Sequence, residues 1–377
     1  MSERCPRFRI AEGPDPCSNS TVETRVIQVD PDHPDVEKLK PAAEILQKGG
    51  VVAIPTETVY GLAVDLDHPD AIQRLLKLRE SPPDKLITIH VGSQEDAEHY
   101  ARIPPCGRGR RLVSRLWPGP LTAVFPGPDG GEVGVRFPAH RAAAELLRLA
   151  RVRAGVPSAN RSGRPPATTP AEVLEQFNGR IEVLVDAGPT RLRTSSTVVR
   201  ATGTRLEVLR EGAVPKSALE ALDYFSVLFV CTGNTCRSPM AERLFRRALA
   251  RRLSVDESML DTRGYRVGSA GTGAAAGAGA TALAIEALRE MDADLAPHRS
   301  RPLSMALVQD ADLVFVMTER HRNLVLEWLP ECGPHIKLLD PNGRDIDDPF
   351  GSEVGVYRAC ARRIAEYAEK RAGEIVP

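Results

Sequence analysis

The sequence predicts two successive α/β domains, each built on a sheet covered by helices. The chain has 377 residues, enough for two domains of ordinary size. Short apolar runs alternate with amphipathic helical segments, and this alternation starts afresh near residue 226. We therefore expect a flexible, polar leader over 1–22, an N-terminal domain over 23–213, a short linker over 214–225 and a C-terminal domain over 226–373.

The N-terminal domain begins with a predicted helix. Apolar residues fall on one face from Val36 to Leu46, and Gly49-Gly50 ends the pattern. A buried strand is predicted at 51–54, directly before Pro55. Further strands are expected at 86–91, 121–125, 133–137, 181–185, 197–200 and 206–209, and helices at 71–78, 139–149 and 170–177.

The C-terminal domain repeats this pattern in a more regular form. A fully apolar strand over 227–230 leads through a loop of small residues into a helix, with Pro239 in its first turn. Strands at 265–267, 313–316 and 336–339 alternate with helices at 282–291, 319–328 and 355–372. This alternation predicts a parallel four-stranded sheet in a three-layer αβα arrangement. The Gly- and Ala-rich segment 268–284 is either a flexible surface loop or a loop packed beside an active site.

The composition excludes several classes of protein. Fifty Lys and Arg balance fifty Asp and Glu, which argues against binding to nucleic acid or membrane by bulk charge. The apolar runs are shorter than the roughly 18–20 residues that a membrane span needs, and the N-terminus does not resemble a secretory signal. Seven Cys without a C-x-x-C pair indicate neither a disulfide framework nor a metal site. We expect a reduced, cytoplasmic chain.

The strongest motif of the sequence joins the apolar strand at 227–230 to the helix that follows it. Cys231 leaves the strand directly, and Arg237 stands where the helix begins. The loop between them consists of Thr232, Gly233, Asn234, Thr235 and Cys236. Its backbone N–H groups and the helix N-terminus form a cradle for an anion and favour a thiolate at Cys231. Arg237 can bind phosphate bidentately, and Ser238 can hydrogen-bond to the sulfur.

These residues, CTGNTCRSPMAE, resemble the low-molecular-weight protein tyrosine phosphatases. The resemblance covers about 226–373 and continues through 269–271, 298–300, 311–313, 317–318 and 348–351. It implies a cofactor-independent phosphatase with Cys231 as nucleophile, Arg237 as phosphate ligand and Asp348 as general acid. Asp345 and Asp347 stand close by, but Asp348 is the one that directly precedes Pro, as in the family.

Two departures from the tyrosine-specific pattern favour the protein-arginine phosphatase branch. Thr235 stands where tyrosine phosphatases usually carry Ile, and Phe350 is a single aromatic residue where a pair is common. The resemblance therefore implies phosphoarginine in proteins as substrate, with phosphotyrosine as the alternative. An arsenate reductase would need relay thiols, and the window 300–312 has none. Cys236 either forms a reversible disulfide with Cys231 or simply packs the loop.

A second group of motifs lies in the N-terminal domain. Hydroxyl-bearing segments at 55–62, 117–122 and 158–160 and cations at 77, 79 and 136 are expected at strand ends and in loops. Together they suit a polyphosphate bound beside a small carboxylate. A P-loop kinase is unsupported, because this half contains no Walker sequence.

In this order, over about 23–213, the motifs resemble the YrdC-like L-threonylcarbamoyladenylate synthases, which have a twisted open α/β sheet. The resemblance implies conversion of ATP, with its Mg²⁺, L-threonine and bicarbonate to threonylcarbamoyl-AMP, which tRNA-modification proteins then use. Threonine would be contacted by Thr58, His90, Arg136 and Ser196. The nucleotide would be contacted by Lys77, Arg79, Thr122, Ser158, Asn160 and Arg210.

The N-terminal half also departs from its family. Asp84-Lys-Leu86 stands where the family usually has Asn-Pro-Leu, and Ser195 stands where Glu often precedes the Ser-Thr pair. A non-catalytic nucleotide- or RNA-binding module is therefore the alternative for this half. The arginine run at 108, 110, 111 and 115 is either a weak RNA-binding surface or a solvated helix face.

Overall fold

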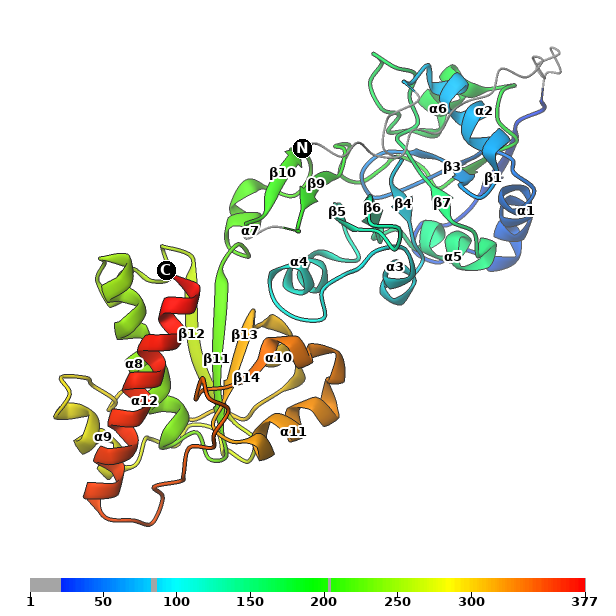
Figure 1. The fold of residues 1–377 in the computed structure, drawn as a ribbon. Coiled ribbons are helices and arrows are strands. Elements are labelled where there is room, and N and C mark those ends of the chain that lie inside the picture. The colour runs from blue at the N-terminus through cyan, green and yellow to red at the C-terminus, as the bar shows by residue number, and fades with distance from the viewer. Residues whose placement is uncertain (1–21, 83–86, 203–204, 377) are drawn as a thin grey trace. The chain divides into compact units, whose positions relative to one another are not determined.

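The computed structural model describes residues 22–82, 87–202 and 205–376, and they form two compact units (Figure 1). The first unit comprises Met1–Ile103 and Val113–Leu219, and the second comprises Pro104–Leu112 and Glu220–Pro377. Nearly all of the leader predicted at 1–22, and the segment 84–86, lie outside the described residues. Both units are α/β, as the sequence predicts.

The first unit is built on a mixed sheet. Its strands are β1 (Arg25–Gln28), β2 (Val52–Ile54), β3 (Gly61–Asp65), β4 (Ile89–His90), β5 (Leu121–Pro126), β6 (Glu132–Arg136), β7 (Ala154–Gly155), β8 (Val183–Asp186), β9 (Thr197–Arg200) and β10 (Glu207–Arg210). Among the described residues these strands lie in the order β1-β8-β2-β3-β7-β4-β6-β5-β9-β10. Parallel and antiparallel pairs alternate irregularly along it.

Helices cover both faces of this sheet. The helices in this part of the chain are α1 (Val36–Gln47), α2 (Pro69–Arg79), α3 (Gln94–Tyr100), α4 (Arg108–Leu116), α5 (Arg141–Ala150), α6 (Pro170–Phe177) and α7 (Lys216–Glu220). Alternate residues of β2 point to opposite faces: Val52 and Ile54 join the core of α1 and α5, whereas Ala53 joins that of α2 and α6. The helix predicted from Val36 to the glycine pair is confirmed.

The sequence did not reveal β3, although this strand leads out of the 55–62 motif. All five residues of β3 are buried, so the alternation typical of a half-buried strand is missing. Gly61 opens the strand, and a Cβ there would lie 2.4 Å from Val156 Cγ1. Glycine at this position therefore lets two segments of the first unit approach closely.

The second unit has the predicted parallel four-stranded sheet between two layers of helices (Figure 1). Its strands are β11 (Phe225–Cys231), β12 (Tyr265–Gly271), β13 (Leu313–Val316) and β14 (Ile336–Leu338), in the order β12-β11-β13-β14. Its α-helices are α8 (Arg237–Leu253), α9 (Ala282–Arg289), α10 (Met305–Asp310), α11 (Glu319–Trp328) and α12 (Val354–Ile375), with 3₁₀ turns η1 (Glu257–Met259) and η2 (Pro330–His335). Phe229 packs towards α8, α9 and α12, and Val230 packs towards α10 and α11.

The segment 104–112 interrupts the sequence of the first unit but packs within the second. Arg111 is fully buried there, donates hydrogen bonds to the carbonyl oxygens of Leu222 (3.2 Å) and Tyr224 (2.5 Å), and lies over the Tyr224 ring. Arg108 pairs with Asp223 at 2.8 Å. The prediction of a solvated helix face is therefore wrong for Arg111, because its guanidinium satisfies buried carbonyl groups.

The same segment corrects the expectation of a fully reduced chain. Cys106 and Cys332 form a disulfide in the structure, with their Cα atoms 6.0 Å apart. The two residues are 226 positions apart in the sequence, so no spacing rule could have paired them. Cys231, Cys236 and Cys360 are not disulfide-bonded.

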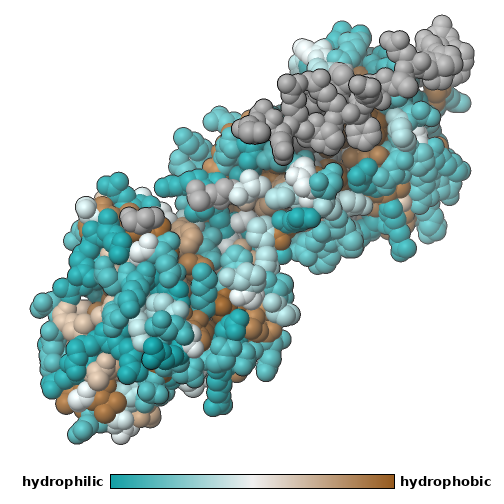
Figure 2. Space-filling view, viewed as in Figure 1, coloured by the Kyte–Doolittle hydropathy of each residue, from teal (hydrophilic) through white to brown (hydrophobic). Residues whose placement is uncertain are grey.

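The surface and the helices agree with the absence of membrane-spanning signals in the sequence. The face seen in Figure 2 is largely hydrophilic, with apolar side chains in small groups. Within the described ranges, no helix has the length and apolarity required to cross a bilayer.

The core of the second unit provides a test of this packing. Phe229 is fully buried and its ring lies 5.3 Å from that of Phe245 and 5.7 Å from that of Phe315. We expect Phe229→Ala to lower the free energy of unfolding of the second unit by about 3–5 kcal/mol, because it removes apolar contacts and leaves a cavity. Urea unfolding monitored by circular dichroism measures this. Val356→Ala, at a 42% exposed position, is the control and should change stability little.

Candidate functional site

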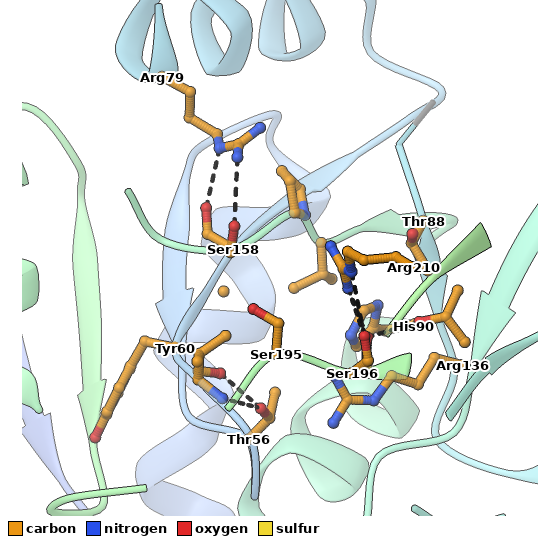
Figure 3. A pocket seen from close by; sticks show the side chains of 15 residues that line it. Thr56, Tyr60, Arg79, Thr88, His90, Arg136, Ser158, Ser195, Ser196 and Arg210 are labelled. Atoms are coloured by element: carbon orange, nitrogen blue, oxygen red, sulfur yellow. Dashed lines mark hydrogen bonds between the residues drawn. The ribbon is translucent and has the colours of Figure 1, made fainter. Parts of the chain in front are cut away.

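The first unit contains a cavity of about 100 Å³ to which most of its sequence motifs contribute (Figure 3). Of the residues predicted to bind substrates, those that line it are Arg79, His90, Thr122, Arg136, Ser158, Ser196 and Arg210. Thr58, Lys77 and Asn160 do not line it. The cavity therefore brings three of the four predicted cations and three hydroxyl groups together from segments far apart in the chain.

Arg136 enters this cavity from the end of β6. Its Nη2 donates to Glu57 Oε1 at 2.8 Å, and its Nε donates to the carbonyl oxygen of Gly119 at 3.2 Å. The side chains of Arg136 and Glu57 are only 4% and 2% exposed. Nη1 has no hydrogen-bond partner within the described residues. One guanidinium edge is thus fixed by protein, which leaves a donor for an anionic ligand.

Arg210 lies on the same side of the cavity as Arg136 and fixes the segment at Ser196 (Figure 3). Its Nη2 donates to the carbonyl oxygen of Ser196 at 2.7 Å and to its Oγ at 3.1 Å. Ser196 Oγ also lies 3.0 Å from Thr122 Oγ1. Burial, together with the charge of Arg136, lowers the pKa of Arg210. A Cβ at Gly212 would lie 2.3 Å from the Ser195 carbonyl oxygen, so glycine lets the chain close on this segment.

Arg79 and Asn160 together fix Ser158. Arg79 Nε donates to the Ser158 carbonyl oxygen at 2.9 Å, and Ser158 Oγ donates to Asn160 Oδ1 at 2.6 Å. Asn160 Nδ2 in turn donates to the carbonyl oxygens of Arg161 and Arg164. Asn160 therefore orients the Ser158 hydroxyl without lining the cavity itself. Burial lowers the pKa of Arg79.

The threonine motif at 55–62 places different residues in the cavity from those predicted. Thr58 is fully buried, and its hydroxyl lies 2.8 Å from that of Thr56, which lines the cavity. Tyr60 of the same motif lines it too, so the motif contributes to the cavity through Thr56 and Tyr60. Thr88 and Ser195 also line the cavity, and no pattern in the sequence singled them out as ligands.

His90 lies in the cavity wall on β4 and is buried. Burial and the neighbouring Arg136 charge hold its pKa well below the usual value, so the imidazole is neutral at physiological pH. Its Nδ1 has no partner among the described residues. The site thus combines buried cations, a neutral imidazole and hydroxyl groups, which suits a phosphate chain and a carboxylate.

The second unit has a cavity of about 230 Å³ at the end of β11. It is lined by Cys231, Thr232, Gly233, Thr235, Cys236, Arg237, Asp348 and Phe350. Asn234 has the left-handed backbone conformation (φ 53°), and its N–H donates to Cys231 Sγ at 3.2 Å. Ser238 Oγ lies 3.0 Å from the same sulfur. The loop therefore directs at the sulfur the hydrogen-bond donors that would stabilise a thiolate.

Arg237 and Asp348 form an ion pair in the wall of this cavity. Arg237 Nη2 donates to Asp348 Oδ2 at 2.5 Å, and Nη1 donates to the carbonyl oxygen of Ile346 at 2.9 Å. The neighbouring carboxylates lie elsewhere: Asp345 accepts from the backbone N–H of Glu319, and Asp347 is 94% exposed. The structure thus distinguishes Asp348 from the other two members of its acidic cluster.

A buried network supports the loop from below. Asn234 Nδ2 donates to Ser238 Oγ at 2.9 Å and to Ser269 Oγ at 2.8 Å. A Cβ at Gly271 would lie 2.4 Å from the carbonyl oxygen of Thr232. The Gly- and Ala-rich segment packs beside the loop, because Gly273 N–H donates to that same carbonyl and Thr281 N–H donates to Thr235. The prediction of a loop beside the active site is confirmed over that of a flexible surface loop.

The remaining thiols of the second unit differ in their surroundings. Cys236 Sγ lies 3.3 Å from Thr281 Oγ1 and 3.6 Å from the Tyr357 hydroxyl, so it packs the loop in this structure. Burial raises the pKa of Cys360 to about 12, and Cys360 does not line the cavity. Cys231 is therefore the thiol best placed for nucleophilic chemistry, with a guanidinium and a carboxylate beside it.

Comparison of the sequence with known families also divides the chain into two parts, although the first match runs continuously through 104–112. The family described as "Telomere recombination" (Sua5/yciO/yrdC) matches residues 44–212. The low molecular weight phosphotyrosine protein phosphatase family matches residues 226–375.

Curated relatives resemble the first unit. The threonylcarbamoyl-AMP synthase of Thiobacillus denitrificans is 37% identical over 172 residues, which are 42% of this chain and 88% of that protein. The synthase of Pyrococcus abyssi is 38% identical over 192 residues, which are 48% of this chain. The chain spans 56% of the length of the P. abyssi protein and 55% of that of the Bacillus subtilis synthase.

Solved structures resemble both units. P. abyssi Sua5 complexed with L-threonine is 24% identical, with a TM-score of 0.50, and the match covers 92% of this chain and 98% of that one. YwlE arginine phosphatase from Geobacillus stearothermophilus is 34% identical over 40% of this chain and 92% of its own, with a TM-score of 0.35. By sequence and by site, then, this chain belongs to the threonylcarbamoyl-AMP synthase family through its first unit, and its second unit is a low-molecular-weight phosphatase domain.

Proposed function

We propose that the chain is a bifunctional enzyme. The first unit makes threonylcarbamoyl-AMP from ATP, L-threonine and bicarbonate for tRNA modification, and the second hydrolyses phosphoarginine in proteins. The observation that carries this proposal is that each unit has its own cavity, with its family's reactive side chains gathered around it. Mg²⁺ would enter the first site with ATP.

In the first unit the chain's own residues bind and orient substrates without a covalent nucleophile. Arg136 Nη1 would hold the threonine carboxylate, and Arg79 and Arg210 would neutralise phosphate charge. Neutral His90 can accept or donate a hydrogen bond without adding further positive charge. Rate would come from keeping a carbamate near the α-phosphate while fixed cations offset the negative charge that develops.

In the second unit the reaction would proceed in two steps at one phosphorus atom. Cys231 Sγ attacks phosphorus as the P–N bond of phosphoarginine breaks, and Asp348 donates a proton to the leaving guanidinium nitrogen. Asp348 then takes a proton from water, which attacks the cysteinyl phosphate and releases inorganic phosphate. Ser238 stabilises the departing sulfur in this step.

Thr235 and Phe350 support phosphoarginine over phosphotyrosine. Both line the cavity, and Thr235 places a hydroxyl there, which can accept a hydrogen bond from a guanidinium. Phe350 is 70% exposed and offers one aromatic wall, whereas a phosphotyrosine ring is better held by two.

Two variants separate the activities in one purified protein. Cys231→Ser should abolish phosphatase turnover, because an alkoxide is far less available than a thiolate at pH 7, while pyrophosphate release with ATP, threonine and bicarbonate continues.

The paired substitution Arg136→Met with Glu57→Leu should weaken threonine use in the pyrophosphate assay at least tenfold, since a hydrogen bond to a charged group contributes about 1.5–3 kcal/mol.

Both tests take account of the burial of the residues that are changed. Arg136 is replaced together with Glu57, because its loss alone would leave a buried carboxylate without a counter-charge. Cys360→Ser alters a buried thiol outside the cavity and should retain phosphatase activity. A wild type that binds ATP but releases no pyrophosphate with threonine and bicarbonate present would instead indicate a nucleotide-binding module without synthase activity.

Thr235→Ile tests the choice of phosphatase substrate. Loss of the hydroxyl should shift the ratio of kcat/KM for phosphoarginine over phosphotyrosine by roughly one to two decades towards phosphotyrosine. Thr235→Ser keeps the hydroxyl and is the matched control. Equal slowing of both substrates, or a wild type that already prefers phosphotyrosine, would make the second unit a tyrosine phosphatase.

A further inference from the structure

A chain of three hydrogen-bonding side chains leads from helix α11 to the phosphate loop. Thr318 caps the N-terminus of α11, where its Oγ1 accepts the backbone N–H of His321 at 3.3 Å. The same Oγ1 lies 2.7 Å from His321 Nδ1. His321 Nε2 lies 2.9 Å from Thr232 Oγ1, and Thr232 follows Cys231 in the loop. His321 is 6% exposed and does not line the cavity, whereas Thr232 does.

The protonation state of His321 limits how protons are arranged along this chain. Burial, and then the charge of Arg237, lowers the pKa of His321 to about 4, so the ring carries one N–H at physiological pH. If that proton were on Nδ1, Thr318 Oγ1 would accept two N–H groups, and its own proton would have no acceptor among the described side chains. If it is on Nε2, Thr318 donates to Nδ1, and the hydroxyl proton left without an acceptor among the described side chains is that of Thr232, which lines the cavity.

The second arrangement has a consequence for Thr232. The ring N–H occupies a lone pair of Thr232 Oγ1, so the hydroxyl proton of Thr232 must point elsewhere. Thr232 lines the cavity beside Cys231 and Arg237, where a phosphoryl group is expected. A hydroxyl that accepts from the ring is therefore left to donate to an oxyanion.

We propose that Thr232 is a phosphoryl-binding residue and that His321, the positioning residue behind it, sets its hydroxyl as a donor to the substrate oxyanion. This inference rests on the proposed phosphatase function of the second unit. The ring acts through Thr232 alone, so replacing His321 should have no further effect once Thr232 has lost its hydroxyl.

A double-mutant cycle measured with tungstate, a tetrahedral oxyanion, tests this coupling. We expect Thr232→Val and His321→Asn each to weaken tungstate binding about tenfold in isothermal titration calorimetry, because each removes an oriented donor to an anion. The double variant should bind no more weakly than Thr232→Val. Losses that multiply to about a hundredfold would overturn the proposal.

Two further variants separate positioning from a merely structural role. The side-chain amide of Asn reaches about as far as Nδ1 of His, and that of Gln about as far as Nε2. His321→Gln should therefore restore most of the binding that His321→Asn loses, and Thr232→Ser should bind tungstate like the wild type. Failure of Gln to restore binding in a variant with unchanged thermal unfolding would overturn the proposal.

Tungstate binding keeps this test separate from the proposed function. If the wild type binds tungstate but hydrolyses no phosphorylated substrate, the proposed phosphatase function is contradicted. The double-mutant cycle would still measure the coupling of His321 to Thr232. Unchanged tungstate affinity in His321→Asn would contradict the proposed coupling of His321 to Thr232 without contradicting the proposed phosphatase function. A wild type that binds no tungstate would overturn the inference.

Discussion

Buried positive charge is the constraint on which the first site depends. Three guanidinium groups face a single cavity, and Glu57 is the only described carboxylate that pairs with any of them. The other two are held by hydroxyls and by carbonyl oxygens of the loops that form the cavity walls. The cations therefore organise the loops, and their burial makes the empty site unfavourable relative to the anion-filled one.

The second site also contains a buried guanidinium, but it is balanced by a carboxylate that the proposed reaction uses. Arg237 is buried and pairs with Asp348, the carboxylate that would later move a proton. In the proposed reaction, a phosphoryl group bound to Arg237 would replace this partner and free Asp348 to face the leaving group. The loop itself is held through neutral side chains, from Asn234 to Ser269, and Ser269 in turn donates to the carboxylate of Glu242 at 2.6 Å.

The sequence predicted those parts of the molecule in which one local pattern is sufficient. The helix from Val36, the strand before Cys231 and the parallel sheet of the second unit follow from periodicity, and the loop 231–237 follows from its spacing. The remaining features depend on long-range packing. β3 is buried on both faces and shows no alternation. Thr56 rather than Thr58 lines the cavity, and no local pattern distinguishes these two threonines. His321 stands outside every motif, because its role depends on a contact made 89 residues away.

Because of residues 104–112, the structural units of this chain are not continuous segments of the sequence. They lie between segments of the first unit in sequence, yet they supply Cys106 to the core of the second and Arg111 to its buried carbonyl groups. A fragment that begins at residue 220 would lack this segment, so the thiol of Cys332 would lose its covalent partner and Asp312 its guanidinium. The phosphatase half is thus discontinuous in sequence, and a single cut in the chain cannot release it whole. Separating the two units at any one peptide bond would therefore leave residues of one unit on the other fragment.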